Sequence, residues 1–270
     1  MKIYILFIFI VSIILLDQAT TSANDRRFTY TYETLVLPRG AREFEIWNTY
    51  RTDRGYFYRR LDQRMQFEFG LGHNLMSALY LNTSWRLQDA NGSEPGGEAV
   101  PSQEISISSE WKYKLLDRVA DPVGFGLYGE ATLGLNEVEL EGKLLLDKQI
   151  GNFLFAFNGV IENEWETELE GGTTETGKEL SLEFDLGASY LVAGSFSLGF
   201  ELRNINRLEE GKIETSSLFA GPVLAYTDEN WWAALTIMPQ VTSFKGATNG
   251  NLALNDNEKV EARLLFSFHL

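Results

Sequence analysis

KVEARLLFSFHL, residues 259–270, is the stretch that most clearly indicates the fold of this chain. In an extended conformation, one of its faces carries only apolar side chains, namely Val260, Ala262, Leu264, Phe266, Phe268 and Leu270. The opposite face is mainly polar, with Lys259, Glu261, Arg263, Ser267 and His269. Alternation with a period of two residues predicts a β-strand, and helical spacing does not fit it.

The same alternation recurs along the chain. It is clear in residues 138–148 and 179–191, where leucines and aromatic residues alternate with charged and small residues. Applied to the whole sequence, this pattern predicts twelve strands, at 41–51, 57–70, 75–87, 103–114, 122–135, 138–148, 152–165, 179–191, 195–206, 214–226, 231–243 and 258–270.

The predicted connections alternate in length. Tight turns are expected at 72–74, 151, 193–195 and 227–230, and long polar loops at 88–102, 166–178 and 244–257. In an up-and-down arrangement, the tight turns would lie at one rim and the long loops at the other. Because no linker or second composition zone interrupts residues 41–270, they are expected to form one domain.

Strand length favours a membrane-spanning barrel over a soluble one. Many of the predicted strands are about twice as long as the ~5 to 6 residues usual in soluble proteins, and a bilayer-crossing strand needs ~9 to 11. The even strand number and the aromatic residues near strand ends also fit. The predicted fold class is therefore all-β, a transmembrane antiparallel β-barrel of about 12 strands in an up-and-down meander. Pro222 and Pro239 cannot donate to a ladder, so either bulges or non-donating positions are expected there.

The N-terminus has a different character. Lys2 precedes an apolar run over residues 3–16, and Thr21, Ser22 and Ala23 are small residues suited to a peptidase, so residues 1–23 are predicted to be a cleaved signal peptide. Residues 24–40 are expected to be a periplasmic N-terminal segment. Its aromatic residues Phe28, Tyr30 and Tyr32 leave two alternatives, a short periplasmic strand or partial insertion into the lumen.

Composition excludes several functions. The net charge of −15 disfavours nucleic-acid binding, and the absence of cysteine excludes disulfides, zinc–cysteine sites and cysteine nucleophiles. The chain has two histidines; His73 falls in a predicted turn and His269 is the penultimate residue. No catalytic residue, metal site or cofactor is predicted, and the chain is not expected to be an enzyme.

Residues 260–270 resemble the C-terminal strand of Gram-negative outer-membrane proteins, which the barrel-assembly machinery reads during biogenesis. The resemblance implies that Leu264, Phe266, Phe268 and Leu270 form the assembly signal, with Leu270 in place of the more common terminal phenylalanine. Residues 30–45 and 221–240 resemble an uncharacterised family of twelve-stranded barrels. These resemblances imply a place in the cell outer membrane and contact with its lipid. Export is expected to follow from the signal peptide, and the barrel is expected to be a monomer.

If the apolar faces meet lipid, the polar faces line the lumen, because a charge facing lipid near the midplane costs ~2 to 4 kcal/mol. An acidic wall is then predicted on the middle strands, from Glu130, Glu139, Glu141, Asp147, Glu162, Glu164, Glu183, Asp185 and Glu201, with Lys143 and Arg203 as its bases. A more basic side is predicted where the barrel closes, from Arg51, Arg60, Arg64, Arg86, Lys259 and Arg263.

Three functions remain open from the sequence. The first is a narrow passive, porin-like channel for small polar or cationic solutes, with a field between the two charged walls. The second is a non-conducting structural or surface-interaction barrel that acts through its extracellular loops, with arginines and carboxylates paired so that they fill the lumen. The third is a soluble periplasmic β-barrel that binds an apolar ligand.

Overall fold

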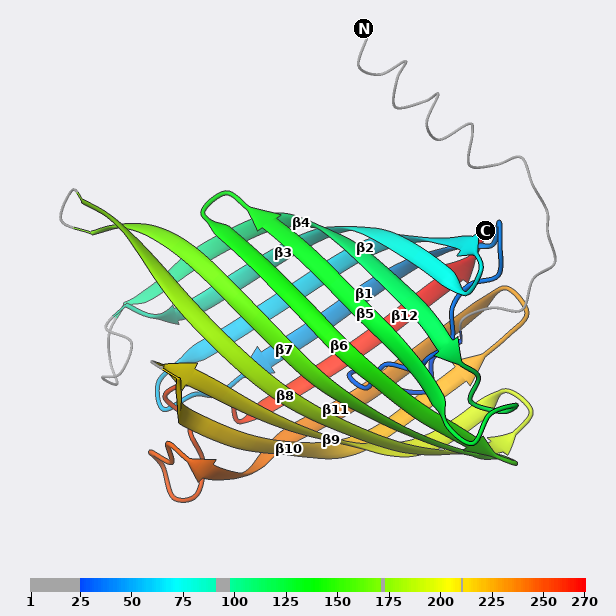
Figure 1. The fold of residues 1–270 in the computed structure, drawn as a ribbon. Helices are drawn as coiled ribbons and strands as arrows, with labels where there is room; N and C mark the ends of the chain where they lie inside the picture. Colours follow the sequence, from blue (N-terminus) through cyan, green and yellow to red (C-terminus); the bar gives the residue numbers. More distant parts are fainter. Residues whose placement is uncertain (1–24, 91–97, 171–172, 210) are drawn as a thin grey trace, which may run out of the picture.

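The computed structural model describes residues 25–90, 98–170, 173–209 and 211–270. They form an antiparallel meander in which β1 pairs with β12 and closes the sheet (Figure 1). The strands are β1 (Arg42–Thr52), β2 (Tyr58–Gly72), β3 (Leu75–Asp89), β4 (Ala99–Leu116), β5 (Gly124–Gly134), β6 (Glu137–Ile150), β7 (Phe153–Glu170), β8 (Thr173–Ala193), β9 (Phe196–Glu209), β10 (Lys212–Thr227), β11 (Trp231–Lys245) and β12 (Val260–His269).

The predicted all-β, twelve-stranded barrel is therefore confirmed. The predicted signal peptide, residues 1–23, lies outside the described residues. Within the described ranges, no helix is long and apolar enough to cross a membrane.

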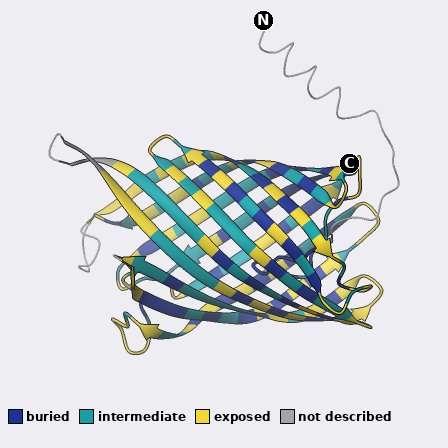
Figure 2. Ribbon diagram, in the orientation of Figure 1, coloured by how far each residue is buried: buried dark blue, intermediate teal, exposed yellow. Residues whose placement is uncertain are grey.

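Exposed and buried positions alternate along the strands, as Figure 2 shows. The outward positions form an apolar belt that includes Ile107, Leu144, Ile161, Phe184 and Ile237, all of them exposed. In water such a surface would be unfavourable, whereas a bilayer requires it. In β12 the predicted outward row is exposed at Leu264, Phe268 and Leu270 and partly covered at Phe266, which stacks on Trp231. This belt and the closed sheet define a transmembrane β-barrel.

The rim at which β1 begins and β12 ends has short connections throughout, whereas the longest connection, between β11 and β12, lies at the other rim. The rim with the chain ends is periplasmic in outer-membrane barrels. His73 and Asn74 form one of these turns, and both have positive φ, 53° and 61°. A two-residue turn of this kind matches the twist of the flanking strands. His73 therefore has a structural role in this turn, at the rim opposite the longer loops.

One predicted loop was wrong. Residues 166–178 continue the β7–β8 hairpin, with Glu166 paired to Gly177 and Thr167 to Thr176. The alternation of apolar and polar residues fails here because both faces of the hairpin lie beyond the apolar belt, while threonine still favours the extended backbone. The predicted loop at 88–102 is shorter for the same reason, since β3 and β4 pair as far as Asp89 and Ala99.

The two prolines at which bulges or non-donating positions were expected both lie within strands. Pro222 pairs with Phe200 of β9, and Pro239 pairs with Val260 of β12. Between β10 and β11, however, the paired residues pass directly from Phe219 and Gln240 to Val223 and Thr236. The side of each proline that lacks an N–H is therefore turned toward this interrupted β10–β11 ladder. The register shifts of the same ladder lie nearby, between residues 216 and 219. Non-donating positions and adjacent irregularities both occur.

Replacement of an outward leucine tests the orientation of the barrel. Leu144 lies halfway along β6 and is 54% exposed, so Leu144→Arg should lower the free energy of unfolding in lipid bilayers by about 2 to 4 kcal/mol. Leu135, in the β5–β6 turn and 93% exposed, provides the control, and Leu135→Arg should change it by less than about 0.5 kcal/mol. Denaturant unfolding followed by tryptophan fluorescence measures both; equal effects of the two variants would contradict the lipid-facing assignment of Leu144.

Candidate functional site

The lumen is divided into two parts. The outer part is a cavity of about 590 Å³, hereafter the vestibule, which is lined by charged side chains from most of the strands. Tyr30, Tyr32 and Trp47 belong to its lining. The periplasmic part is occupied by residues 25–41, hereafter the N-terminal segment, whose blue trace turns into the barrel in Figure 1.

Glu201 of β9 anchors the N-terminal segment through its backbone. One carboxylate oxygen accepts hydrogen bonds from the backbone N–H groups of Tyr30 and Thr31, at 2.9 and 2.8 Å. The other accepts from the N–H and hydroxyl groups of Thr29, at 3.1 and 3.2 Å, and from the Thr236 hydroxyl at 2.6 Å. A fully buried carboxylate is stable here because donors surround it.

Two further lumen side chains continue this anchoring. Asn158 forms two hydrogen bonds with the backbone of Tyr32, accepting from its N–H at 2.6 Å and donating to its C=O at 2.9 Å. Asp147 accepts from the backbone N–H of Thr34 at 2.9 Å and from its hydroxyl at 2.7 Å. The backbone N–H groups of residues 29–32 and of Thr34 therefore bond to side chains of the barrel wall instead of a neighbouring strand.

Aromatic side chains of the segment fill the space between the walls. Phe28 packs with Leu154, Ala156 and Val223, and Tyr30 packs with Phe219 and Met238. The Tyr30 hydroxyl donates to Glu261 at 2.9 Å, and burial raises the pKa of Tyr30, which keeps this donor protonated. Neutral apolar packing and buried hydrogen bonds together hold the segment in place.

Glycines on the barrel wall leave room for the N-terminal segment because they have no side chain. A Cβ atom at Gly187 would lie 2.7 Å from the Phe28 ring, and one at Gly70 would lie 1.8 Å from the carbonyl oxygen of Pro38. Of the two alternatives for residues 24–40, the short periplasmic strand was wrong, since none of residues 25–41 is in a strand. The described part of this segment lies in the lumen.

Most of the predicted wall residues line the vestibule, and four do not. On the acidic side, the cavity is lined by Glu130, Glu139, Glu141, Glu162, Glu164 and Glu183. Asp185, Glu201 and Asp147 are buried outside it, the last two against the N-terminal segment. On the basic side, it is lined by Arg51, Arg60, Arg64, Arg86 and Arg263. Lys259 precedes β12, is exposed and does not line the cavity.

The vestibule also has lining residues that the strand pattern missed. Arg54 and Glu258 come from the β1–β2 and β11–β12 connections, and they form an ion pair at 2.5 Å. Glu137, Glu166, Glu179 and Arg207 line it from the ends of the strands. No periodicity identifies residues in connections, but a continued polar row at the predicted strand ends could have indicated the last four.

Nearly every base in the vestibule is paired. The cavity is lined by thirteen carboxylates and nine bases, and eight of the nine bases lie within 4.0 Å of a carboxylate oxygen. Arg64 pairs with Glu130 at 2.9 Å across the lumen, and Arg203 pairs with Glu183 at 2.7 Å. The ninth base, Arg263, stacks on the Tyr30 ring at 3.8 Å instead.

The surplus charge is therefore negative and localised. Five lining carboxylates have no basic partner within salt-bridge distance among the described residues, and all belong to β6 and β7: Glu137, Glu139, Glu162, Glu164 and Glu166. Carboxylate oxygens of Glu137, Glu139 and Glu164 lie within 4.8 Å of one another. These side chains are partly exposed to the cavity, so water can solvate them. The arrangement can attract a cation without fixing it.

A closed twelve-stranded sheet with an apolar outer belt and a charged lumen is the architecture of a transmembrane β-barrel. Residues 20–270 match a family described as "Family of unknown function (DUF6662)", so the chain belongs to that family. No curated protein matches the sequence.

Similar solved structures share the fold at low identity. The COG4313 outer membrane channel from Pseudomonas putida F1 is 12% identical, with a TM-score of 0.60 over 90% of this chain and 100% of that chain. The translocator domain of the autotransporter NalP from Neisseria meningitidis is 11% identical, with a TM-score of 0.58 over 86% of this chain and 88% of that one. The NanC porin is 11% identical, with a TM-score of 0.52 over 84% of this chain and 100% of that one.

The anchoring role of Glu201 can be tested by proteolysis. Glu201→Ala leaves the N–H groups of Thr29, Tyr30 and Thr31 without an acceptor, at about 1 to 3 kcal/mol each. Since 1.4 kcal/mol corresponds to about tenfold, trypsin should cleave after Arg26 or Arg27 at least about 10 times faster in the folded variant. The control is Glu164→Ala, which removes a carboxylate on the vestibule wall. Trypsin should cleave this variant at the same rate as the unmodified chain. Equal rates for all three proteins would show that Glu201 does not hold the segment.

Proposed function

We propose that this protein is an outer-membrane, porin-like channel that admits small polar solutes, preferentially cations, through the vestibule. The observation that carries the proposal is the strip of five carboxylates on β6 and β7 that have no basic partner within salt-bridge distance among the described residues. A barrel filled only for stability would gain by pairing these groups, because each buried or half-buried charge costs free energy without a partner.

The wall opposite the carboxylate strip carries basic side chains. Arg51, Arg60 and Arg86 lie on β1, β2 and β3, across the lumen from the carboxylate strip, although each is paired with a carboxylate. Walls of opposite character set up a transverse field that orients dipolar solutes, and the surplus of four negative charges favours cations. A charged lumen does not suit an apolar ligand, which argues against a soluble binding barrel.

The N-terminal segment limits passage to the periplasm. Its hydrogen bonds to Glu201, Asn158 and Asp147 span β9, β7 and β6, so the segment crosses the lumen below the vestibule. A solute must pass beside it or wait for it to move. We therefore expect a small conductance in the intact protein and a larger one when the segment is released.

Charge removal on the strip tests the selectivity. A triple substitution of Glu139, Glu162 and Glu164 to glutamine keeps the side-chain shape and removes three of the four surplus charges. Because a charge at ~4 Å contributes ~1 kcal/mol in water-like surroundings, the cation-to-anion permeability ratio should fall by about fivefold or more. The ratio follows from the reversal potential of planar bilayers under a salt gradient. The control is Glu209→Gln, Glu214→Gln, Glu229→Gln, which removes three exposed carboxylates outside the cavity lining.

The second candidate function is a non-conducting surface-interaction barrel. It is favoured by the same N-terminal segment, if the segment seals the lumen permanently. The Glu201→Ala protein separates the two: current that appears or increases with the loss of the anchor supports a channel. No current in either protein, while both run as folded barrels on gels, would contradict the channel and favour an action through the outer loops.

The proposed location depends on assembly, in which the monomer is recognised through its last strand by the barrel-assembly machinery. Phe268 faces outward beside Phe44 of β1 and packs on Phe266 with ring centroids 4.6 Å apart. Near the interface, a carboxylate costs only ~0 to 1 kcal/mol in stability, so Phe268→Asp should block assembly more than it weakens the folded barrel. We expect at least about tenfold less heat-modifiable protein in the outer membrane. Tyr190→Asp, an outward aromatic of β8, is the control; equal losses would contradict a specific signal in β12.

A further inference from the structure

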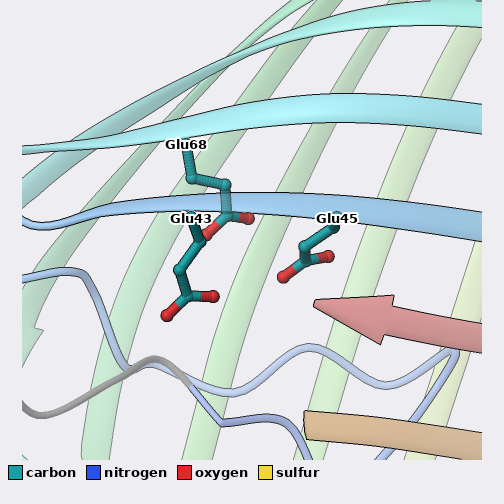
Figure 3. Close-up of side chains that lie close together, drawn as sticks. All are labelled: Glu43, Glu45 and Glu68. Atoms are coloured by element: carbon teal, nitrogen blue, oxygen red, sulfur yellow. The ribbon is translucent and has the colours of Figure 1, made fainter. Parts of the chain in front are cut away.

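A second group of carboxylates lies at the periplasmic end of the lumen, away from the vestibule. Glu43 and Glu45 of β1 and Glu68 of β2 leave the sheet on the same side and converge (Figure 3). Oxygens of the three carboxylates lie within 4.8 Å of one another, and the residues are only 1%, 0% and 4% exposed. The pairing of Glu43 with Glu68 and of Glu45 with Gln66 across β1 and β2 makes a square of four oxygen-bearing side chains.

The hydrogen bonding of this square is incomplete. Among the described residues, Glu45 Oε1 and Glu68 Oε2 are buried without a hydrogen-bond partner. Gln66, 1% exposed, has its amide nitrogen 2.9 Å from Glu45 and 2.6 Å from Glu68, so its amide group points between the two carboxylates. The amide oxygen of Gln66 also has no partner. Amide oxygen and nitrogen exchange places by a rotation of the side chain, and the rotated amide presents an oxygen to the carboxylates.

The local charge is also unbalanced. Glu110 adds a fourth carboxylate to the surroundings of Glu45 and Glu68, and the nearby bases are Arg26 of the N-terminal segment and Lys112 of β4. The imidazole of His269 lies 3.7 Å from a Glu43 oxygen, whereas Glu45 and Glu68 have no basic partner within salt-bridge distance among the described residues. Acidic groups therefore outnumber basic ones where water has little access. Buried charge without a partner is costly, and a divalent cation between Glu45 and Glu68 would balance it.

We propose that Glu43, Glu45, Glu68 and the amide oxygen of Gln66 bind a divalent cation of the hard, oxygen-preferring class, with Ca²⁺ as its natural member. Carboxylate and amide oxygens are the ligands that Ca²⁺ prefers. This assignment replaces the expectation of no metal site, and it holds whether or not the barrel conducts.

The site would stabilise the closure of the barrel. Glu43 also accepts hydrogen bonds from Ser267 of β12 at 3.1 Å and from the Trp232 indole of β11 at 3.4 Å. Glu45 accepts from the Trp47 indole at 2.6 Å, and the guanidinium of Arg26 lies 4.8 Å from the ring of Trp47. A cation between these carboxylates therefore links β1 and β2, the strands next to the β1–β12 seam, and lies beside the N-terminal segment.

The two indoles provide a direct readout. Tb³⁺ replaces Ca²⁺ in oxygen sites and emits when a nearby tryptophan is excited. After treatment of the intact barrel in detergent with a chelator, Tb³⁺ should give tryptophan-sensitised emission that Ca²⁺ abolishes by competition. Added Ca²⁺ should also raise the temperature at which the barrel unfolds, because a ligand that binds only the folded state stabilises it. Elemental mass spectrometry should find about one Ca²⁺ per chain before chelation.

Matched variants locate the site. Glu45→Gln, Glu68→Gln removes two of its charges and should weaken Tb³⁺ binding by more than about 100-fold. Loss of a residue that only supports a metal ligand can already weaken metal binding by about 100-fold, and here two ligands are lost. Glu139→Gln, Glu164→Gln removes two charges from the other close carboxylate group, in the vestibule, and should leave the affinity within about twofold. Heat-modifiable migration on gels shows whether each variant is folded; if the double variant does not fold, Gln66→Leu takes its place, with at least about tenfold weaker binding expected.

Three results would overturn the proposal. The first is absence of both sensitised emission and bound metal in the intact barrel, which would mean that protons or Arg26 and Lys112 balance the carboxylates. The second is loss of the signal only in the vestibule variant, which would place the ion there. The third is a clear preference for Zn²⁺ over Ca²⁺, which would exclude a hard-cation site.

Discussion

The bonding of backbone N–H and C=O groups is the constraint on which the rest of this structure depends, because a bilayer offers these groups no water. The pairing of β1 with β12 removes the two sheet edges and lets every strand bond to both neighbours. Closure in turn fixes the side chains: one row of each strand meets lipid and must be apolar, and the other row is enclosed. The chain's many charged residues can then be placed only in the lumen or at the rims, and this produces a charged interior.

An interior of this kind has to be solvated or filled, and the barrel does both. In the outer half, water reaches the vestibule, and ion pairs hold eight of its nine bases. In the periplasmic half, the N-terminal segment fills the lumen, packing among apolar residues such as Leu145, Val223 and Leu265. Glu201 then has a different task from Glu164, although both are glutamates on lumen faces. It accepts hydrogen bonds from the backbone of the segment, whereas Glu164 faces the cavity.

The sequence predicts the strands and their faces because the bilayer imposes the same local alternation on each strand. Leu264 and Phe268 could be assigned to lipid, and Arg64 and Glu130 to the lumen, from their own neighbours alone. The insertion of residues 25–41 could not be derived in this way. Thr29, Tyr30 and Thr31 are held through backbone N–H groups, which every sequence offers, and their acceptor lies about 170 residues away with no local mark on it. Gly187 was a weak signal, since its lack of a side chain makes room for Phe28.

The two close carboxylate groups show how solvent access decides what the same residue type does. In both groups the oxygens lie within 4.8 Å. At that separation, two like charges repel by ~1 kcal/mol in water but by ~3 to 4 kcal/mol at the effective dielectric of a protein interior. Glu137, Glu139 and Glu164 can therefore remain charged beside the vestibule and attract cations without holding them tightly, as the proposed channel requires. Glu43, Glu45 and Glu68 lack this solvation, and their repulsion must be balanced by something that stays. Depth in the lumen thus separates a surface that attracts ions from a site that retains one.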